Sequence, residues 1–171
     1  TLFFEDSTRT KTSFTLAAKR LGAEVADLSA GSSSVNKGET LIDTARTIEA
    51  MGVHAMIVRA KQSGAAQLIA ANVNVPVINA GDGKHEHPTQ GLLDAYTIAL
   101  AHDRHEFNLA GLTIAIVGDI ASSRVARSNI ACLHALGATT ICVGPPSMAP
   151  KSLELLGTRV SNELDRVLPI A

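Results

Sequence analysis

The sequence has no tryptophan, and aromatic residues make up only 3% of its 171 positions. A surface that stacks nucleic-acid bases on aromatic rings is therefore not expected. The formal net charge is −1, whereas proteins that bind nucleic-acid phosphates carry a clear excess of positive charge. Any positively charged site in this chain must be local rather than spread over the surface.

Cysteine is also scarce, with only Cys132 and Cys142. Each lies in an apolar stretch, which is typical of buried thiols in a reducing compartment rather than of a disulfide framework. No apolar run approaches the roughly 20 residues that a membrane-spanning helix needs, and the first residues lack a signal-peptide pattern. These absences predict a cytoplasmic protein that binds neither membranes nor nucleic acids.

Hydrophobic residues make up 46% of the chain, which is enough for a sizeable core. Short β-branched runs alternate with longer segments of helical periodicity. Strands are expected over 1–4, 23–29, 54–58, 76–80, 112–118, 139–144 and 158–161. Helices are expected over 10–21, 39–51, 63–72, 88–101, 123–136, 151–157 and 162–168.

This alternation is typical of an α/β fold, with doubly wound parallel sheets and flanking helices. We expect two lobes, a first domain over 1–90 and a second over 91–171 that starts with a linking helix. The chain begins with Thr1 and stops in an apolar run. We therefore expect both ends to be cut and the second lobe to be incomplete.

A dense cluster of hydroxyls and cations follows the first expected strand, where ligands bind in α/β folds. Ser7, Thr8, Arg9 and Thr10 stand at the start of a helix, whose unpaired N–H groups and dipole attract anions. An ordinary Ser/Thr cap explains one or two hydroxyls, but not this many together with Arg9 and Lys11. The cluster indicates a site for phosphate or a similar oxyanion.

Arg59 and Lys37 are further candidate anion ligands. Arg59 directly follows the buried run HAMIV, and the alternative is a surface arginine that ends a strand. Lys37 lies in the small-residue loop AGSSSVNKG. It is either a charge that a mobile loop brings to a ligand or a solvated lysine.

The segment HEHPTQ places an imidazole and an amide at a helix start. His87 can interact with a carbonyl oxygen, and Gln90 can accept from an amide N–H; a helix-capping histidine is the alternative. His85 and His87 form an H-x-H pair, but zinc needs three or four ligands and no second cluster supplies them. We therefore expect no metal.

Motifs of other nucleotide and hydrolase sites are missing. The run IAIVGD resembles a dinucleotide-binding start, but the sequence contains neither G-x-G-x-x-G nor the phosphate-binding G-x-x-x-x-G-K-[ST]. It also lacks G-x-S-x-G, and neither cysteine stands in a reactive setting. A nucleotide-binding module is therefore disfavoured.

Five segments occur in order: STRTKTSF, KGETLIDTARTIEAMG, VRAK, HPTQGLLDAYTI and GLTIAIVGDIASSRVARSN. Together they closely resemble the aspartate/ornithine carbamoyltransferases over nearly the whole chain. The resemblance implies transfer of the carbamoyl group of carbamoyl phosphate to an amino acid, with no cofactor. The lysine in NKGETLIDT favours L-aspartate as the acceptor. An ornithine-type enzyme and a non-catalytic homologue are the alternatives.

The resemblance also implies residue roles. The phosphate of carbamoyl phosphate is bound by Ser7, Thr8, Arg9 and Thr10. Arg59 contacts its phosphate and carbonyl, His87 its carbonyl oxygen and Gln90 its nitrogen. In the family, the loop that matches Ser33 and Lys37 enters the site of a neighbouring subunit, so a homotrimer is implied. Lys37 and Arg124 match residues that bind aspartate, and nothing indicates or excludes a regulatory subunit.

Three positions depart from the family pattern. Asp6 stands where proline is frequent, Ala60 where histidine is common, and Ser122 where a bulkier histidine or tyrosine is frequent. The family's later loops, including the arginine-bearing loop that closes on aspartate, have no counterpart in the sequence. We therefore do not expect full activity from this chain alone.

The implied roles predict large effects on catalysis. Replacing Arg9 or Arg59 by alanine in the full-length enzyme should lower turnover by about 10²- to 10³-fold, because each removes a preorganised donor to developing negative charge. Steady-state kinetics with saturating carbamoyl phosphate measure this loss. Near-normal turnover of the Arg59→Ala enzyme would contradict the assignment.

Overall fold

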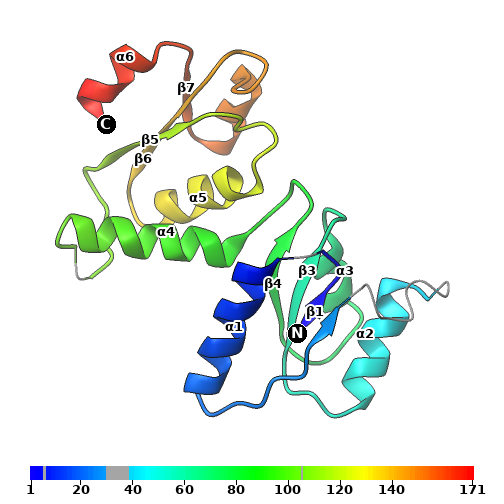
Figure 1. The fold of residues 1–171 in the computed structure, drawn as a ribbon. Helices are drawn as coiled ribbons and strands as arrows, with labels where there is room; N and C mark the ends of the chain where they lie inside the picture. The colour runs from blue at the N-terminus through cyan, green and yellow to red at the C-terminus, as the bar shows by residue number, and fades with distance from the viewer. Residues whose placement is uncertain (6, 30–38, 105) are drawn as a thin grey trace. The chain divides into compact units, whose positions relative to one another are not determined.

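A computed structural model describes residues 1–5, 7–29, 39–104 and 106–171. The chain forms two compact units, Thr1–Gly83 and Lys84–Ala171, and each has a parallel sheet with flanking helices (Figure 1). The α/β class predicted from the sequence is thereby confirmed. The first unit ends at Gly83 and the second begins at Lys84, whereas the sequence predicts a first domain over 1–90.

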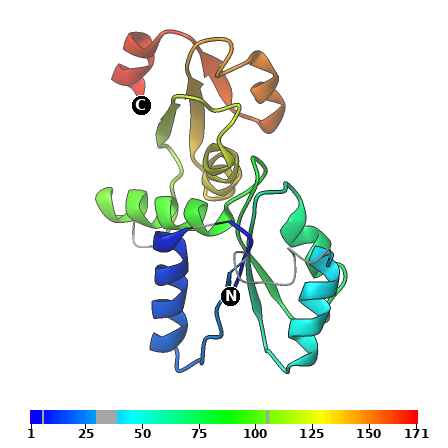
Figure 2. The same cartoon turned by 45° about the vertical axis from the view of Figure 1, so that its right-hand side comes forward.

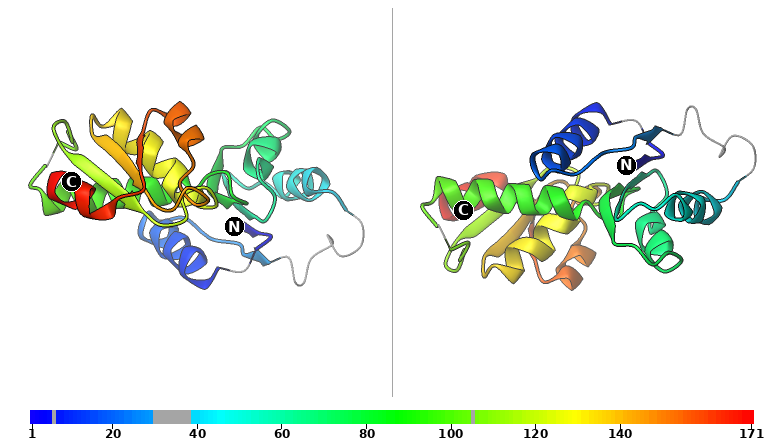
Figure 3. Two further views of the ribbon diagram at one scale, coloured as in Figure 1. Left: turned by 90° about the horizontal axis from the view of Figure 1, so that it is seen from above. Right: turned by 90° about the horizontal axis from the view of Figure 1, so that it is seen from below.

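The first unit contains four strands and three helices among its described residues. These are β1 (Leu2–Phe3), α1 (Thr8–Arg20), β2 (Leu28–Ser29), α2 (Leu41–Ala50), β3 (Met56–Ala60), α3 (Ala65–Ala70) and β4 (Val77–Asp82). The strand order is β2-β1-β3-β4, and all neighbours run parallel. The strands lie between α1 on one side and α2 and α3 on the other (Figures 2 and 3).

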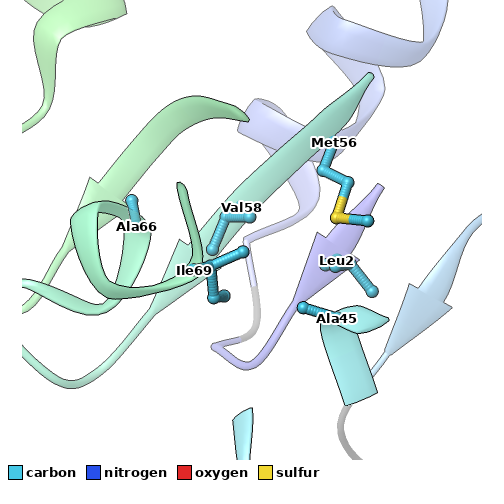
Figure 4. Packing of buried hydrophobic residues seen from close by; sticks show 6 residues of the cluster. All are labelled: Leu2, Ala45, Met56, Val58, Ala66 and Ile69. Atoms are coloured by element: carbon cyan, nitrogen blue, oxygen red, sulfur yellow. The ribbon is translucent and has the colours of Figure 1, made fainter. Parts of the chain in front are cut away.

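Side chains alternate along each strand, so one face of this sheet builds the core with α2 and α3. The cluster consists of Leu2, Ala45, Met56, Val58, Ala66 and Ile69 (Figure 4). The neighbouring residues Phe3 and Arg59 are register partners, and alternation places both on the opposite face, the side on which α1 lies. This placement brings a buried arginine to the same side of the sheet as the start of α1.

The second unit has a three-stranded parallel sheet in the order β5-β6-β7. Its elements are α4 (Pro88–Ala101), β5 (Thr113–Val117), α5 (Arg124–Ala135), β6 (Thr139–Val143), the 3₁₀ helix η3 (Lys151–Leu156), β7 (Arg159–Ser161), α6 (Leu164–Val167) and the 3₁₀ helix η4 (Leu168–Ile170). Helices α4 and α5 lie side by side (Figure 1). None of the helices in the described ranges is long and apolar enough to cross a membrane.

The central strand β6 is buried on both faces. Cys142 packs with Ile130 of α5, whereas Ile141 packs with Val167 of α6 on the other face. Cys142 is buried and Cys132 is half-buried, and both are free thiols. Burial raises the pKa of both thiols, in agreement with the expected unreactive role.

The observed bounds of two strands, β3 and β2, differ from the expected ones in ways that bear on the site and the sheet. The strand expected over 54–58 begins at Met56 and runs to Ala60, so Arg59 lies inside a buried strand rather than after it. The reason is that β1 and β4 pair with β3 beyond Val58. The strand expected over 23–29 is reduced to Leu28–Ser29, because only these residues pair with the short β1.

In the turn after β4, the addition of one methyl group is expected to lower the free energy of unfolding strongly. Gly83 has φ +52°, and a Cβ there would lie 2.6 Å from the backbone nitrogen of Ser63. At Gly52, φ is +87° but a Cβ would meet open space. Gly52→Ala should therefore lower the free energy of unfolding by about 1–2 kcal/mol through its backbone conformation.

Gly83→Ala should lose a further ~1–3 kcal/mol through overpacking. Urea unfolding of both variants, followed by circular dichroism, separates the two effects. Equal stability of the two variants would contradict the tight packing of this turn.

Candidate active site

The first helix begins with the predicted hydroxyl and cation cluster. Ser7 is the N-cap residue of α1 and has an extended backbone, with φ −156° and ψ 89°. Thr8 and Arg9 are exposed and Thr10 is half-buried in the first turn. Lys11, the other cation of the cluster, forms an ion pair with Asp27 at 3.7 Å; the family resemblance gives it no role in binding phosphate.

The start of α1 differs from that of α2. In α2, Thr40 and Asp43 form a capping box, in which the Thr40 hydroxyl accepts from the Asp43 N–H at 3.1 Å. In the described part of α1, Ser7 makes no side-chain capping bond and the first turn contains no acidic residue. No side-chain cap or acidic residue of the first turn therefore offsets the positive potential at the start of α1, which suits the binding of an external anion.

Arg59 supplies a buried positive charge on the same side of the sheet. It is only 7% exposed, and its Nη1 donates to the carbonyl oxygen of Ala80 at 2.7 Å. The adjacent backbone is fixed as well, since the Phe4 N–H donates to the Arg59 carbonyl at 2.7 Å. The interpretation of Arg59 as an exposed strand-end arginine is therefore wrong.

Glu5 is a neighbour of Arg59 that the sequence reasoning missed. The Nη2 atom of Arg59 lies 3.3 Å from Oε1 of Glu5. Glu5 comes two residues after the end of β1. This place was the available signal, because residues after parallel strands gather at one edge of the sheet. The ion pair offsets part of the cost of burying the guanidinium.

His87 stands at the start of α4 in the second unit. It is 8% exposed, and its backbone N–H donates to Oγ of Ser128 on α5 at 2.8 Å. Ser128 in turn donates to the Glu86 carboxylate. The imidazole makes no capping bond to the described helix; its Nδ1 lies 3.4 Å from the Thr89 hydroxyl. His87 is nevertheless the N-cap residue of α4, as the helix-capping interpretation expects, but its side chain does not cap the helix.

The side chain of Gln90 is oriented by α4 and α5 together. Its Nε2 donates to Oδ1 of Asp94 at 2.8 Å, and Asn129 of α5 donates to the other Asp94 oxygen at 2.8 Å. This arrangement leaves the amide oxygen of Gln90 as the end that accepts from an N–H. Gly91 permits the close helix packing, since a Cβ there would lie 3.1 Å from the Ser128 carbonyl oxygen.

Arg124 is the first residue of α5 and is half-buried. Ser33, Lys37 and the departure at Asp6 lie outside the described residues. Ala60, a second departure, is fully buried, and the Ser122 hydroxyl, at the third, lies 3.4 Å from Nζ of Lys84.

The two units thus offer different chemistry. The first unit combines hydroxyls, a helix start and buried Arg59, which together suit a phosphate or another oxyanion. The second unit presents an imidazole, an amide acceptor and an arginine, from His87, Gln90 and Arg124. Such groups suit a polar carbonyl compound and a carboxylate.

Comparison with known proteins gives the class of protein. Residues 1–100 match the family model described as aspartate/ornithine carbamoyltransferase, carbamoyl-P binding domain. Because this match covers more than half of the chain, the chain belongs to the aspartate/ornithine carbamoyltransferase family. The resemblance stated from the motifs is confirmed.

Curated relatives point to one branch of the family. An aspartate carbamoyltransferase catalytic subunit from Granulibacter bethesdensis is 57% identical over 167 residues, covering 98% of this chain and 52% of the relative. The catalytic subunit from Myxococcus xanthus is 55% identical over 170 residues, covering 99% and 56%. The chain thus spans about half the length of the curated relatives it matches.

Solved structures agree with this result. The Trypanosoma cruzi aspartate transcarbamoylase in complex with aspartate and phosphate is 34% identical, with a TM-score of 0.86 over 99% of this chain and 58% of that one. The same enzyme with carbamoyl phosphate and aspartate is 33% identical, also with a TM-score of 0.86, over 99% of this chain and 59% of that one.

The buried Ser128, whose hydroxyl accepts from the His87 N–H, is expected to stabilise the second unit. Ser128→Ala removes the acceptor of the His87 N–H, which leaves a buried donor without its partner. The free energy of unfolding of the second unit should fall by about 1–3 kcal/mol. Urea unfolding followed by circular dichroism measures this change.

The matched control is Ser122→Ala, because the Ser122 side chain is exposed. Its effect should stay within about 0.5 kcal/mol. Equal effects of the two substitutions would show that the Ser128 hydroxyl does not hold the start of α4.

Proposed function

We propose that this chain forms part of an aspartate carbamoyltransferase. It binds carbamoyl phosphate and takes part in transferring the carbamoyl group to the amino group of L-aspartate, which yields N-carbamoyl-L-aspartate and phosphate. This reaction is an early step of de novo pyrimidine biosynthesis. One observation carries the proposal: Arg59 is buried on the same side of the sheet as the start of α1, within residues that match the family's carbamoyl-phosphate-binding domain.

The proposed chemistry is direct acyl transfer. The neutral amino group of aspartate attacks the carbonyl carbon of carbamoyl phosphate, the new C–N bond forms, and the C–O bond to phosphate breaks. The proton that the amine nitrogen loses passes to the departing phosphate. Arg59, Thr10 and His87 stabilise the developing negative charge on the carbonyl oxygen. Orientation and electrostatics supply most of the rate, so the transfer needs no covalent enzyme intermediate and no cofactor.

Other residues bind the ends of the two substrates. Gln90 accepts from the carbamoyl nitrogen, through the amide oxygen that its bond to Asp94 leaves oriented for this role. Arg124 and Lys37 bind the carboxylates of aspartate. The departing phosphate is stabilised by Ser7, Thr8, Arg9 and Lys37.

We propose further that the active protein is a cytoplasmic homotrimer. In this proposal the loop that carries Ser33 and Lys37 acts in the site of the neighbouring subunit. Its support is the resemblance of the motifs to the family, in which the matching loop enters the site of a neighbouring subunit.

A hybrid protein tests the proposed reaction. In it, this chain is joined to the remaining half of the Granulibacter bethesdensis relative. It should form N-carbamoyl-L-aspartate from carbamoyl phosphate and L-aspartate. His87→Ala in the hybrid should lower kcat by about 10²- to 10³-fold, whereas Arg104→Ala, at an exposed position, should leave it unchanged.

Two outcomes would overturn the proposal. Carbamoylation of ornithine in place of aspartate would indicate the sister specificity. Tight binding of a bisubstrate analogue, a phosphonate joined to a diacid, without any product would indicate a non-catalytic homologue.

A further inference from the structure

The pairing of β3 with β4 is irregular beside Arg59. Val58 pairs with Asn79 and Ala60 pairs with Asp82, so one residue of β3 faces two residues of β4, Ala80 and Gly81. Gly81 has φ +114°, a conformation that favours glycine. The extra residue redirects the strand at the place where the Ala80 carbonyl accepts from Arg59.

Two polar side chains bridge this irregularity. The amide oxygen of Asn79 accepts from the Gly81 N–H at 2.8 Å, and its Nδ2 donates to Oδ1 of Asp82 at 2.9 Å. Oδ2 of Asp82 accepts from the N–H of Gly64, in the turn before α3, at 2.6 Å. The bridge therefore ties both ends of the extra residue to the β3–α3 turn.

The location of Asp82 makes this bridge costly to disturb. Its side chain is only 1% exposed, and a buried carboxylate must be matched by hydrogen-bond donors. None of the roles assigned to site residues above involves Asn79 or Asp82. Both nevertheless flank the carbonyl that holds the Arg59 guanidinium.

We propose that Asn79 and Asp82 are positioning residues for Arg59. Their bridge holds the irregular pairing that points the Ala80 carbonyl at the guanidinium. It thereby fixes the direction in which Arg59 offers its N–H groups to the phosphate of the substrate. This inference rests on the proposed function, because it assigns the oxyanion at Arg59 to carbamoyl phosphate.

The chemistry of the bridge provides a sharp test through an exchange of the two residues. In Asn79→Asp, two carboxylates face each other. In Asp82→Asn, two hydrogen-bond donors face each other in every orientation of the two amides. Each amide has only one oxygen, and the N–H groups of Gly81 and Gly64 also need acceptors. In the double variant, the amide introduced at position 82 donates to the carboxylate introduced at position 79, and the N–H groups of Gly81 and Gly64 keep their acceptors.

Binding of inorganic phosphate to this chain, measured by isothermal titration calorimetry, is the readout. Each single variant should raise the dissociation constant by about 10- to 100-fold, as expected when a charged ligand is misdirected. The double variant should restore most of the wild-type affinity. The two single variants change the charge in opposite directions, so a purely electrostatic effect would move their affinities in opposite directions.

The control is Asn108→Asp, which adds the same charge at an exposed turn of the second unit, where the Asn108 side chain accepts from the Ala110 N–H. It should leave phosphate affinity unchanged. If a single variant does not fold, the double variant decides alone: wild-type affinity supports the proposal, and a folded double variant with weak affinity overturns it.

The remaining outcomes separate this inference from the function on which it rests. Folded single variants with wild-type affinity would overturn the positioning role and leave the proposed function intact. A wild-type chain that binds no phosphate would contradict the proposed function, and the positioning role with it.

Discussion

The hydrogen bond from Arg59 to the Ala80 carbonyl is the contact on which the candidate site depends. A guanidinium that is 7% exposed must find acceptors inside the protein, because burying an unmatched charge is prohibitive. The sheet supplies one acceptor through β4 and a second through Glu5, after β1. The parallel arrangement of β1, β3 and β4 therefore does more than form a core, since it fixes a positive charge on the side of the sheet where α1 begins.

The second unit uses the same principle with different groups. Residues of α5 hold the first turns of α4: Ser128 accepts from the His87 backbone N–H, and Asn129 donates to Asp94, which accepts from Gln90. These contacts require the close helix packing that Gly91 allows. A pair of packed helices thus fixes the backbone at His87 and orients the Gln90 amide, as a pair of strands orients a guanidinium in the first unit.

The sequence predicted the architecture well because its periodicity and its strand-ending residues are strong signals. The alternation of strands and helices, the start of α1 at the STRT motif and the start of α4 at Pro88 all follow from local chemistry. The burial of Arg59 could not be predicted this way, because it depends on pairing with β1 and β4, which are distant in the sequence. Glu5, Asn79 and Asp82 were missed for the same reason: each looks like an ordinary strand-end residue until the partner strand is placed.

The proposed function requires that the first unit bind an oxyanion at the start of α1, on the side of the sheet that carries Arg59. Titration of the ¹⁵N-labelled chain with carbamoyl phosphate, followed by NMR, tests it most directly. The NMR signals of the backbone amides of Thr8, Arg9 and Thr10 and of the Arg59 guanidinium should shift together along one saturable binding curve. Shifts confined to other helix starts, such as that of α2, or no saturable shift at all, would contradict it.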